Sequence, residues 1–131
     1  MAKVHVDEES RAFWEALARH ELYLQRCAGC RRFRHPPRAV CPKCLSSDAR
    51  WERASGTGTV YSFTITYQNH APAFRDRLPY VVAYVELDEG VRLMTNVVGC
   101  EPDDVRVGMA VIIEYHDGDD GITLPLFKPC E

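Results

Sequence analysis

The chain has 131 residues, a formal net charge of −3 and 46% hydrophobic residues. This length fits one domain, or a small metal-binding module joined to one modest domain, and the apolar content excludes a disordered chain. The acidic balance argues against general nucleic-acid binding, because a basic surface supplies most of that affinity. No apolar run approaches the roughly 20 residues of a membrane helix, and the start lacks a secretory signal pattern, so we expect a cytoplasmic protein.

The first predicted element is an amphipathic helix over residues 8–20. Asp7 is its expected N-cap, and acidic residues follow in the first turn. Phe13, Trp14 and Leu17 share one apolar stripe. The stripe either packs into the core or docks on a partner, and in the second case Trp14 is the natural anchor.

Two pairs of cysteines with C-x2-C spacing follow, separated by ten residues. Their thiolates can close a tetrahedron around one ion, as structural zinc prefers, and four such ligands leave no open position for chemistry. The spacing also permits a redox disulfide pair, a rubredoxin-like iron site or four unconnected thiols. We favour structural zinc, because two paired knuckles are a more specific signal than one. The predicted metal ligands are Cys27, Cys30, Cys41 and Cys44.

Short strands are expected on both sides of this site, over residues 21–26 and 50–52, where they frame the metal as a ribbon. The stretch from residue 26 to residue 47 contains no acid. Its basic residues are Arg26, Arg31, Arg32, Arg34, Arg38 and Lys43. These cations either offset the negative charge of the metal thiolates or bind an anionic ligand.

The second half of the chain is rich in strand patterns. Gly56 and Gly58 mark a boundary at which the chain can bend or form a bulge. Residues 59–67 alternate in polarity, which predicts a strand. The side chains expected on one face of it are Tyr61, Phe63, Ile65 and Tyr67.

Four further strands are predicted, over residues 80–87, 91–98, 110–116 and 122–127, and residues 88–90 form a hairpin turn between the first two. Pro125 has no amide hydrogen, so the last strand should lie at a sheet edge. Five strands without a long helix between them predict a small Greek-key barrel of the OB type.

The expected fold is therefore mainly β. Residues 1–53 form an N-terminal helix and a rubredoxin-like zinc ribbon, and residues 54–131 form a five-stranded OB-type Greek-key barrel. Residues 68–79 make one long loop, which is either a disordered connector or a functional loop, as loops of this length often are. The loop carries an apolar side chain beside cations: Phe74, Arg75 and Arg77.

No catalytic residue is predicted. The five histidines are scattered, and no nucleophile–base set, phosphate-binding glycine loop or pair of carboxylates stands out. Cys100 and Cys130 stand alone, so we expect structural thiols, which suit a reducing compartment.

The order of these motifs resembles the zinc-ribbon OB-fold proteins long known as a domain of unknown function. In the ribbon half, the resemblance lies in the two cysteine pairs and the Pro-Pro-Arg sequence between them, residues 36–38. In the barrel half it lies in residues 56–64, 79–83, 85–93 and 124–127. It spans nearly the whole chain. One departure is Arg31, because a ribbon knuckle usually has glycine there, and we expect some strain in the metal loop.

The resemblance implies a function in acyl-CoA metabolism. Members of that family are accessory subunits of thiolase-superfamily enzymes, including thiolase with hydroxymethylglutaryl-CoA synthase and lipid-transfer-type aldolases or hydratases of steroid side-chain breakdown. It implies a noncatalytic subunit that binds such an enzyme and helps to form or stabilise its acyl-CoA site, while the partner supplies the catalytic residues. The residues expected to touch a CoA thioester or an acidic partner surface are Arg31, Arg32, Arg34, Phe74, Arg75 and Arg77.

Two other functions stay open at this point. OB barrels and zinc ribbons often bind single-stranded nucleic acid, although this barrel is acidic. A rubredoxin-like electron carrier would show visible iron–thiolate absorption. If the accessory-subunit interpretation holds, the surfaces expected to meet the partner are the helix with Trp14, the loop over residues 68–79 and the strand with Pro125.

Overall fold

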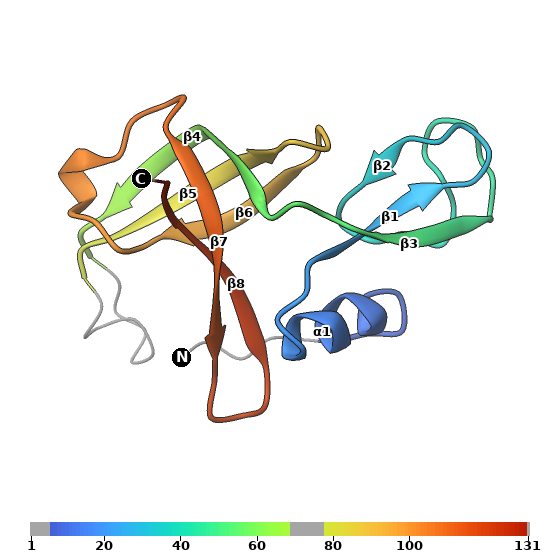
Figure 1. Ribbon diagram of the computed structural model, residues 1–131, viewed down its shortest axis with the longest axis horizontal. Coiled ribbons are helices and arrows are strands. Elements are labelled where there is room, and N and C mark those ends of the chain that lie inside the picture. The colour runs from blue at the N-terminus through green and yellow to red at the C-terminus, as the bar shows by residue number, and fades with distance from the viewer. Residues whose placement is uncertain (1–5, 69–77, 131) are drawn as a thin grey trace.

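The computed structural model describes residues 6–68 and 78–130 (Figure 1). The chain begins with one helix, α1 (Arg11–Ala18), continues into a three-stranded sheet and ends in a closed five-stranded barrel. This architecture confirms the predicted mainly β fold with an N-terminal helix, a ribbon and an OB-type barrel. Within the described ranges, no helix has the length and apolar character needed to cross a membrane.

Helix α1 is shorter than the sequence predicts. Ser10 is the N-cap, and the acidic residues lie in the preceding turn, where the Ser10 amide donates to the Asp7 carboxylate at 2.9 Å. The predicted N-cap at Asp7 is therefore wrong by one turn, because Asp7 caps that turn instead. After the helix, His20 has a φ of 58°, a left-handed conformation that cannot continue an α-helix. The buried side chains of Phe13 and Leu17 confirm that the apolar stripe packs into the core.

The ribbon sheet has β1 at its centre. Strand β1 (Tyr23–Cys27) pairs antiparallel with β2 (Phe33–Arg34) on one side and with β3 (Ala49–Arg53) on the other. The two strands predicted around the cysteine pairs are thus confirmed as neighbours. The sequence did not indicate β2, which is two residues long. Cys27 is the last residue of β1, so the sheet itself sets the position of the first thiol.

The barrel contains β4 (Thr57–Thr66), β5 (Tyr80–Leu87), β6 (Arg92–Val97), β7 (Ala110–Asp117) and β8 (Thr123–Pro129). Their order around the barrel is β4-β5-β6-β8-β7, and β7 returns to β4. The link from β6 to β7 holds a short 3-10 helix, η1 (Pro102–Asp104).

The prediction that the last strand is an edge is wrong. Strand β8 lies between β7 and β6, and it meets β6 in parallel at Val97 and Phe127. The Val98 amide donates to the Phe127 carbonyl at 2.8 Å, and the Thr95 hydroxyl donates to the Pro125 carbonyl at 2.7 Å. Pro125 is tolerated in this interior strand because its carbonyl accepts the Thr95 hydroxyl, and the ladder between β6 and β8 pairs only Val97 with Phe127, so it needs no amide from Pro125.

A bulge in β4 changes which side chains face the core. The pairing with β5 shifts between Val60 and Ser62, so the intervening Tyr61 leaves the alternation. Val60 is buried before the bulge, whereas Phe63 and Ile65 pack against the core after it. Tyr61 remains 47% exposed, and the prediction that it shares a face with Phe63 and Ile65 is therefore wrong.

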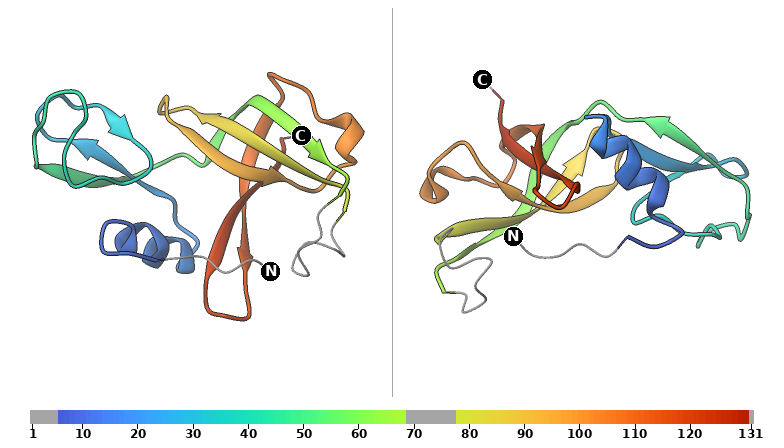
Figure 2. Two further views of the ribbon diagram at one scale, coloured as in Figure 1. Left: turned by 180° about the vertical axis from the view of Figure 1, so that it is seen from behind. Right: turned by 90° about the horizontal axis from the view of Figure 1, so that it is seen from below.

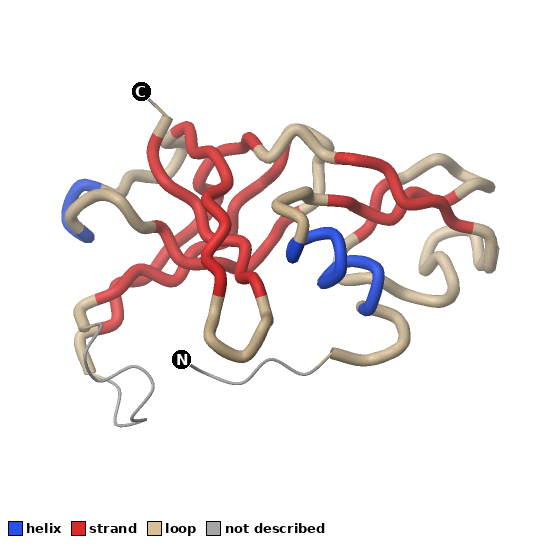
Figure 3. Tube along the Cα trace, turned by 60° about the horizontal axis from the view of Figure 1, so that its bottom comes forward, coloured by secondary structure: helices blue, strands red, loops and turns tan. Residues whose placement is uncertain are grey.

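One hydrophobic cluster joins the helix, the ribbon and the barrel. Leu17 and Leu24 belong to the same cluster as Val85 and Phe127 in the barrel. Figures 2 and 3 show α1 beside the hairpin formed by β7 and β8. The His20 ring, just after α1, stacks on Tyr115 of β7, with ring centroids 4.8 Å apart.

Candidate metal centre and surface clefts

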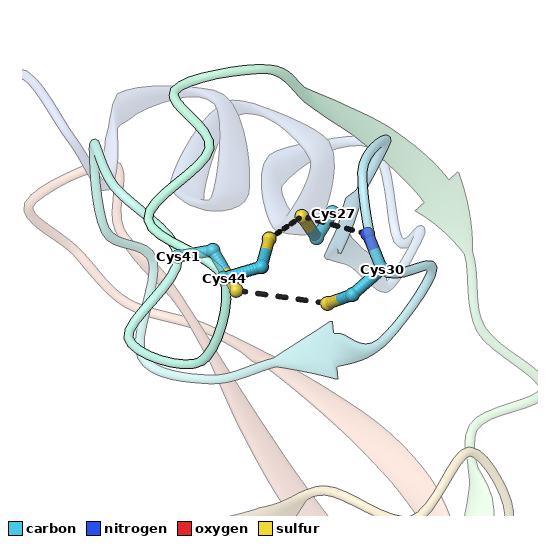
Figure 4. Close-up of side chains that lie close together, drawn as sticks. All are labelled: Cys27, Cys30, Cys41 and Cys44. Carbon is cyan, nitrogen blue, oxygen red and sulfur yellow. Dashed lines mark hydrogen bonds between the residues drawn. The ribbon is translucent and has the colours of Figure 1, made fainter.

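The structure brings the two cysteine pairs together at the end of the ribbon (Figure 4). All four Sγ atoms lie within 4.8 Å of one another, with 3.4 Å between Cys27 and Cys44 and 3.7 Å between Cys30 and Cys41. Metal–sulfur bonds of about 2.3 Å in a tetrahedron place the sulfurs about 3.8 Å apart. The thiols thus already have the spacing that a tetrahedral metal ion requires.

Backbone amides in each knuckle point toward the sulfurs. The Cys30 amide donates to Cys27 Sγ at 3.4 Å, and the Lys43 amide donates to Cys41 Sγ at the same distance. Arg31 and Leu45, the residues after each second cysteine, both have a φ of 65°. This left-handed conformation favours glycine, so the strain predicted at Arg31 is present, and Leu45 shares it.

The environment of the thiols favours two thiolates but opposes four. The Cys30 amide, with the Cys44 thiol, lowers the pKa of Cys27 to about 6. The amides of Cys44 and Lys43 lower the pKa of Cys41. The Ser46 amide favours ionised Cys44, but the Cys27 thiol and burial outweigh it and raise the pKa of Cys44 to about 11.

A bound cation would resolve this conflict, because a metal ion deprotonates the thiols that coordinate it. The donor set, four thiolates in a tetrahedron, fits a structural metal ion. All four positions around such an ion would be occupied by protein, so it could hold the ribbon together but could not bind a substrate.

The basic residues of the ribbon do not form one cluster. Arg31 lines a cleft of about 340 Å³ together with Arg26, Arg50 and Glu52. Arg26 is already committed, because its guanidinium donates to the Arg31 carbonyl and to Glu52. Arg31 therefore lies in a cleft that contains a carboxylate, apart from the cleft that Arg32 and Arg34 line.

Arg34 is a buried residue with a structural role. It is only 8% exposed, and it donates through Nε to Gln25 Oε1 at 2.9 Å and through Nη2 to the Arg38 carbonyl at 2.7 Å. The Arg38 amide donates to the same Gln25 oxygen at 2.8 Å. Gln25 and Arg34 thus fix the loop that leads to the second cysteine pair.

A second cleft lies between the ribbon and the barrel. It has a volume of about 330 Å³ and is lined by Arg32, Arg34 and Lys43 from the ribbon and by Arg92 from the barrel. Figure 1 shows the turn between β5 and β6 directed toward the ribbon at this place. Sequence reasoning missed Arg92, because nothing in the local sequence shows that this hairpin approaches the cysteine loops.

An apolar groove runs between α1 and the barrel. It has a volume of about 220 Å³ and is lined mainly by apolar side chains, Phe13, Trp14, Leu93, Met94, Leu124 and Leu126. Met94 is 63% exposed, and Trp14 is partly buried against Phe13 in an edge-to-face contact. Two of the surfaces expected to meet a partner, the helix and the strand with Pro125, thus meet in one groove.

The remaining predicted ligand contacts, Phe74, Arg75 and Arg77, lie outside the described residues.

A polar contact that the sequence did not reveal connects the end of α1 to the barrel. His20 Nε2 lies 3.0 Å from the Asp117 carboxylate, which also accepts a hydrogen bond from Thr123 at 2.7 Å. In the sequence, His20 is only the last residue of the helix predicted over residues 8–20.

Fold and metal centre together define a zinc-ribbon OB-fold protein, and family models match both parts of the chain. Residues 14–49 match the model described as "ChsH2, rubredoxin-like zinc ribbon domain", and residues 51–116 match "ChsH2, C-terminal OB-fold domain". The chain belongs to this family, also known as DUF35.

Curated relatives fall into two kinds. The chain is 48% identical over 119 residues to a "Probable enoyl-CoA hydratase alpha subunit" of Thermomonospora curvata, and 36% identical over 118 residues to a "3-oxo-4,17-pregnadiene-20-carboxyl-CoA hydratase alpha subunit" of Mycobacterium tuberculosis. These matches cover 90% and 89% of this chain but only 37% of each relative. A "DUF35 domain-containing scaffold protein" of Methanocaldococcus jannaschii is 39% identical, with 86% of this chain and 84% of the relative covered.

Solved structures show the same fold. A chain of an "Ltp2-ChsH2(DUF35) aldolase" superimposes with a TM-score of 0.89 at 42% identity, covering 97% of this chain and 98% of that one. A DUF35 protein from Sulfolobus solfataricus superimposes with a TM-score of 0.68 at 18% identity, which supports the fold alone.

Proposed function

We propose that this chain is a noncatalytic accessory subunit that binds a thiolase-like or lipid-transfer-type enzyme and helps to form or stabilise its acyl-CoA site. The observation that carries this proposal is the end-to-end likeness, at 42% identity, to a chain of the Ltp2–ChsH2(DUF35) aldolase. Relatives named as hydratase alpha subunits and as scaffold proteins support a subunit role in a larger assembly. The names of the same relatives support a role in steroid side-chain or fatty acyl-CoA metabolism.

The metal centre supports the noncatalytic part of the proposal. We propose zinc as the ion, held by the four cysteines, because the donor set is that of a structural zinc ribbon. Because the four cysteines would fill every coordination position, the zinc ion would only stabilise the shape of the ribbon. In this view residues 1–53 and 54–131 act as two parts of one subunit, with the ribbon held rigid beside the barrel.

The apolar groove between α1 and the barrel is the surface we propose for the enzyme. Met94 is exposed, Trp14 lies at the groove wall, and aromatic and methionine side chains are enriched at interface centres. Strand addition at Pro125 is not available, because β8 is paired on both sides. We therefore propose that the enzyme contacts the side chains of the groove and does not add a strand beside Pro125.

The proposed ligand contacts are Arg31, Arg32 and Arg34, together with Phe74, Arg75 and Arg77 of the loop that the structure does not describe. Arginine suits a CoA phosphate or a partner carboxylate, because its planar fork makes paired, charge-assisted bonds. Neutralising Arg31 and Arg32 should weaken acyl-CoA turnover by the complex in a salt-dependent way. If such a variant keeps wild-type turnover and assembly, these arginines serve only to offset the negative charge of the metal thiolates.

The direct experiment is co-expression with a thiolase-like or lipid-transfer-type enzyme from the same host. Size exclusion should show one heteromeric species, and an acyl-CoA lyase or condensation assay should detect activity that the chain lacks by itself. A chain that elutes alone beside every such enzyme would contradict the proposal.

Single-strand nucleic-acid binding is the second candidate. Tyr61 and Tyr84 are each 47% exposed, on the first and second barrel strands, and exposed aromatic side chains of OB barrels can bind single strands by base stacking. The net charge of −3 opposes it. Tight oligonucleotide binding at physiological salt, without any enzyme partner, would favour this candidate.

A further inference from the structure

We propose that the cleft between the ribbon and the turn joining β5 to β6 binds a phosphate or diphosphate group. Four cationic side chains line it: Arg32, Arg34, Lys43 and Arg92. No carboxylate is among its lining residues in the described part of the chain. This separates it from the cleft of Arg31, where Glu52 already supplies an anion.

The first reason to expect an anion in this cleft is the buried charge of Arg34. Its guanidinium is buried, and both hydrogen bonds it makes go to uncharged acceptors, the Gln25 amide oxygen and the Arg38 carbonyl. None of the ion pairs among residues 6–68 and 78–130 includes it. A buried charge without a counterion is costly, and an anion in the cleft would compensate it.

One donor of Arg34 is also uncommitted. Its Nη1 is buried and has no hydrogen-bond partner among the described residues. Leaving a charged donor unsatisfied costs more than leaving a neutral one. Because Nη1 is not exposed, direct contact with a ligand requires movement of the atoms that cover it.

The other cations stand at the rim of the cleft. Arg32 and Lys43 are exposed on the ribbon side, and Arg92 is exposed on the barrel side. The guanidinium carbon of Arg92 lies 3.7 Å from the centre of the Tyr61 ring, a stacking contact that orients the planar group and leaves its edge free to donate. Its ion pair with Glu86 is long, at 3.9 Å, and half exposed.

Several cations around one point favour a phosphate over a single carboxylate. A phosphate group carries up to about two negative charges and three acceptor oxygens, so it can engage the rim cations and Arg34 together. The competing counterion is the thiolate centre itself, since Cys41 also lines the cleft. If the metal-bound thiolates fully compensate Arg34, the cleft has no need of an anion.

This inference deepens the ligand part of the proposed function and rests on it only for the source of the phosphate. The affinities for inorganic pyrophosphate and for CoA, compared with each other, distinguish the sources of the phosphate. Equal affinity for the two indicates a site for the phosphate group alone, and tighter binding of CoA indicates a nucleotide-type cofactor. Both results support the site.

The test uses the full, metal-loaded chain at low ionic strength, where surface charge is least screened. Titration with pyrophosphate and with CoA is followed by nitrogen-15 NMR of the Arg34 Nε–H and the Gly90 and Val91 amides. Sodium chloride at matched ionic strength gives the background. We expect saturable shifts at these groups, and the double variant R32Q/R92Q should bind about tenfold more weakly or worse.

The matched control is R11Q/R53Q, which removes the same charge from exposed positions that line neither this cleft nor the cleft of Arg31. It should bind as the wild-type chain does. The R32Q/R92Q variant keeps every bond of Arg34, so a folding defect does not obscure the result. Absence of saturable shifts, or equal weakening in both double variants, would overturn the site. Complex formation with the enzyme is a separate measurement, so failure here is distinguishable from failure of the proposed function.

Discussion

Gly58 lies where β4 approaches β5 too closely for a side chain. A Cβ at this position would overlap the Glu86 carbonyl oxygen, and a backbone atom cannot move aside as a flexible side chain can. We predict that Gly58→Ala lowers the free energy of unfolding by about 2 kcal/mol or more. Chemical denaturation monitored by circular dichroism would measure the change.

The control for that change is Gly90→Ala in the turn between β5 and β6. Gly90 has a φ of 91° and no atom within 4 Å of an added Cβ, so only conformational strain opposes the substitution. We expect a loss of about 1 kcal/mol. Equal losses at the two positions would show that steric contact at Gly58 is not the cause.

His35 makes stability depend on pH. Burial, and then the charge of Arg38, lower its pKa from 6.5 to about 4. Between these values the imidazole is neutral in the folded chain and protonated in the unfolded chain. Stability contributed by His35 is therefore complete above pH 6.5 and is lost as the pH falls toward 4, by about 3 kcal/mol if the whole shift is realised.

The variant that tests this is His35→Phe, because it keeps an aromatic ring against Phe13. In the wild-type chain the centroids of the His35 and Phe13 rings lie 5.0 Å apart. We predict that the variant loses less stability than the wild-type chain between pH 6.5 and pH 4. Protonation of the cysteines weakens metal binding in both proteins, so the difference between the two curves isolates His35. Parallel curves would refute the assignment, and His116→Gln, an exposed histidine, serves as the control.

At the scale of elements, we expect the ribbon to depend on a metal ion bound by its four cysteines. Its three strands are short, and the buried cluster gains most of its members from α1 and the barrel. In such small modules the free energy of metal binding is largely free energy of folding. We predict about one zinc per chain by elemental analysis. Zinc removal or Cys41→Ser should abolish amide protection in β1 to β3, whereas β4 to β8 keep theirs.

The lone thiol at Cys130 is the matched control, because it is exposed and far along the chain from both knuckles. Cys130→Ser should keep full zinc content and full protection. If Cys41→Ser behaves in the same way, the four cysteines do not hold a structural ion.

The contact between α1 and the β7–β8 hairpin is a second element-scale feature. Thr123, then His20, stabilise the Asp117 carboxylate and lower its pKa from the ordinary 3.8. Its contribution to stability is therefore present above pH 3.8 and is lost as the pH falls through the lowered pKa. We predict that Asp117→Asn has a lower melting temperature than the wild-type chain at neutral pH, and that this difference disappears in strong acid.

Asp119→Asn, in the same turn and exposed, is the control for that prediction, and it should melt as the wild-type chain does at every pH. A difference for Asp117→Asn that persists unchanged in acid would point to packing rather than to the ionised carboxylate.

For the whole molecule, the groove beside α1 carries the predicted interface. An aspartate in place of Met94 would put a charge in the lining of the groove, where it must be desolvated on binding. We predict that Met94→Asp weakens binding to the enzyme partner about tenfold or more. Val107→Asp changes an equally exposed apolar residue outside the groove and should bind normally. Co-purification and binding isotherms compare them, and equal affinity would exclude this face.

The sequence by itself determined the features that depend on local spacing. Two C-x2-C pairs are enough to predict one tetrathiolate centre, because each pair brings two thiols to one point whatever surrounds it. Period-2 alternation and turn residues likewise identify the five barrel strands. Local spacing does not set the start of α1, since Asp7 and Ser10 can both cap a turn, and the structure places the N-cap at Ser10.

Tertiary structure decided which faces and charges those elements present. The bulge at Tyr61 exposes a side chain that strict alternation would place with Phe63, and closure of the barrel turns the strand with Pro125 from an edge into an interior strand. Arg34 is identical in type to Arg32, yet one is buried and the other exposed. Burial and neighbouring charge depend on segments distant in sequence, such as the hairpin that brings Arg92 to the ribbon, and local sequence carries no record of that approach.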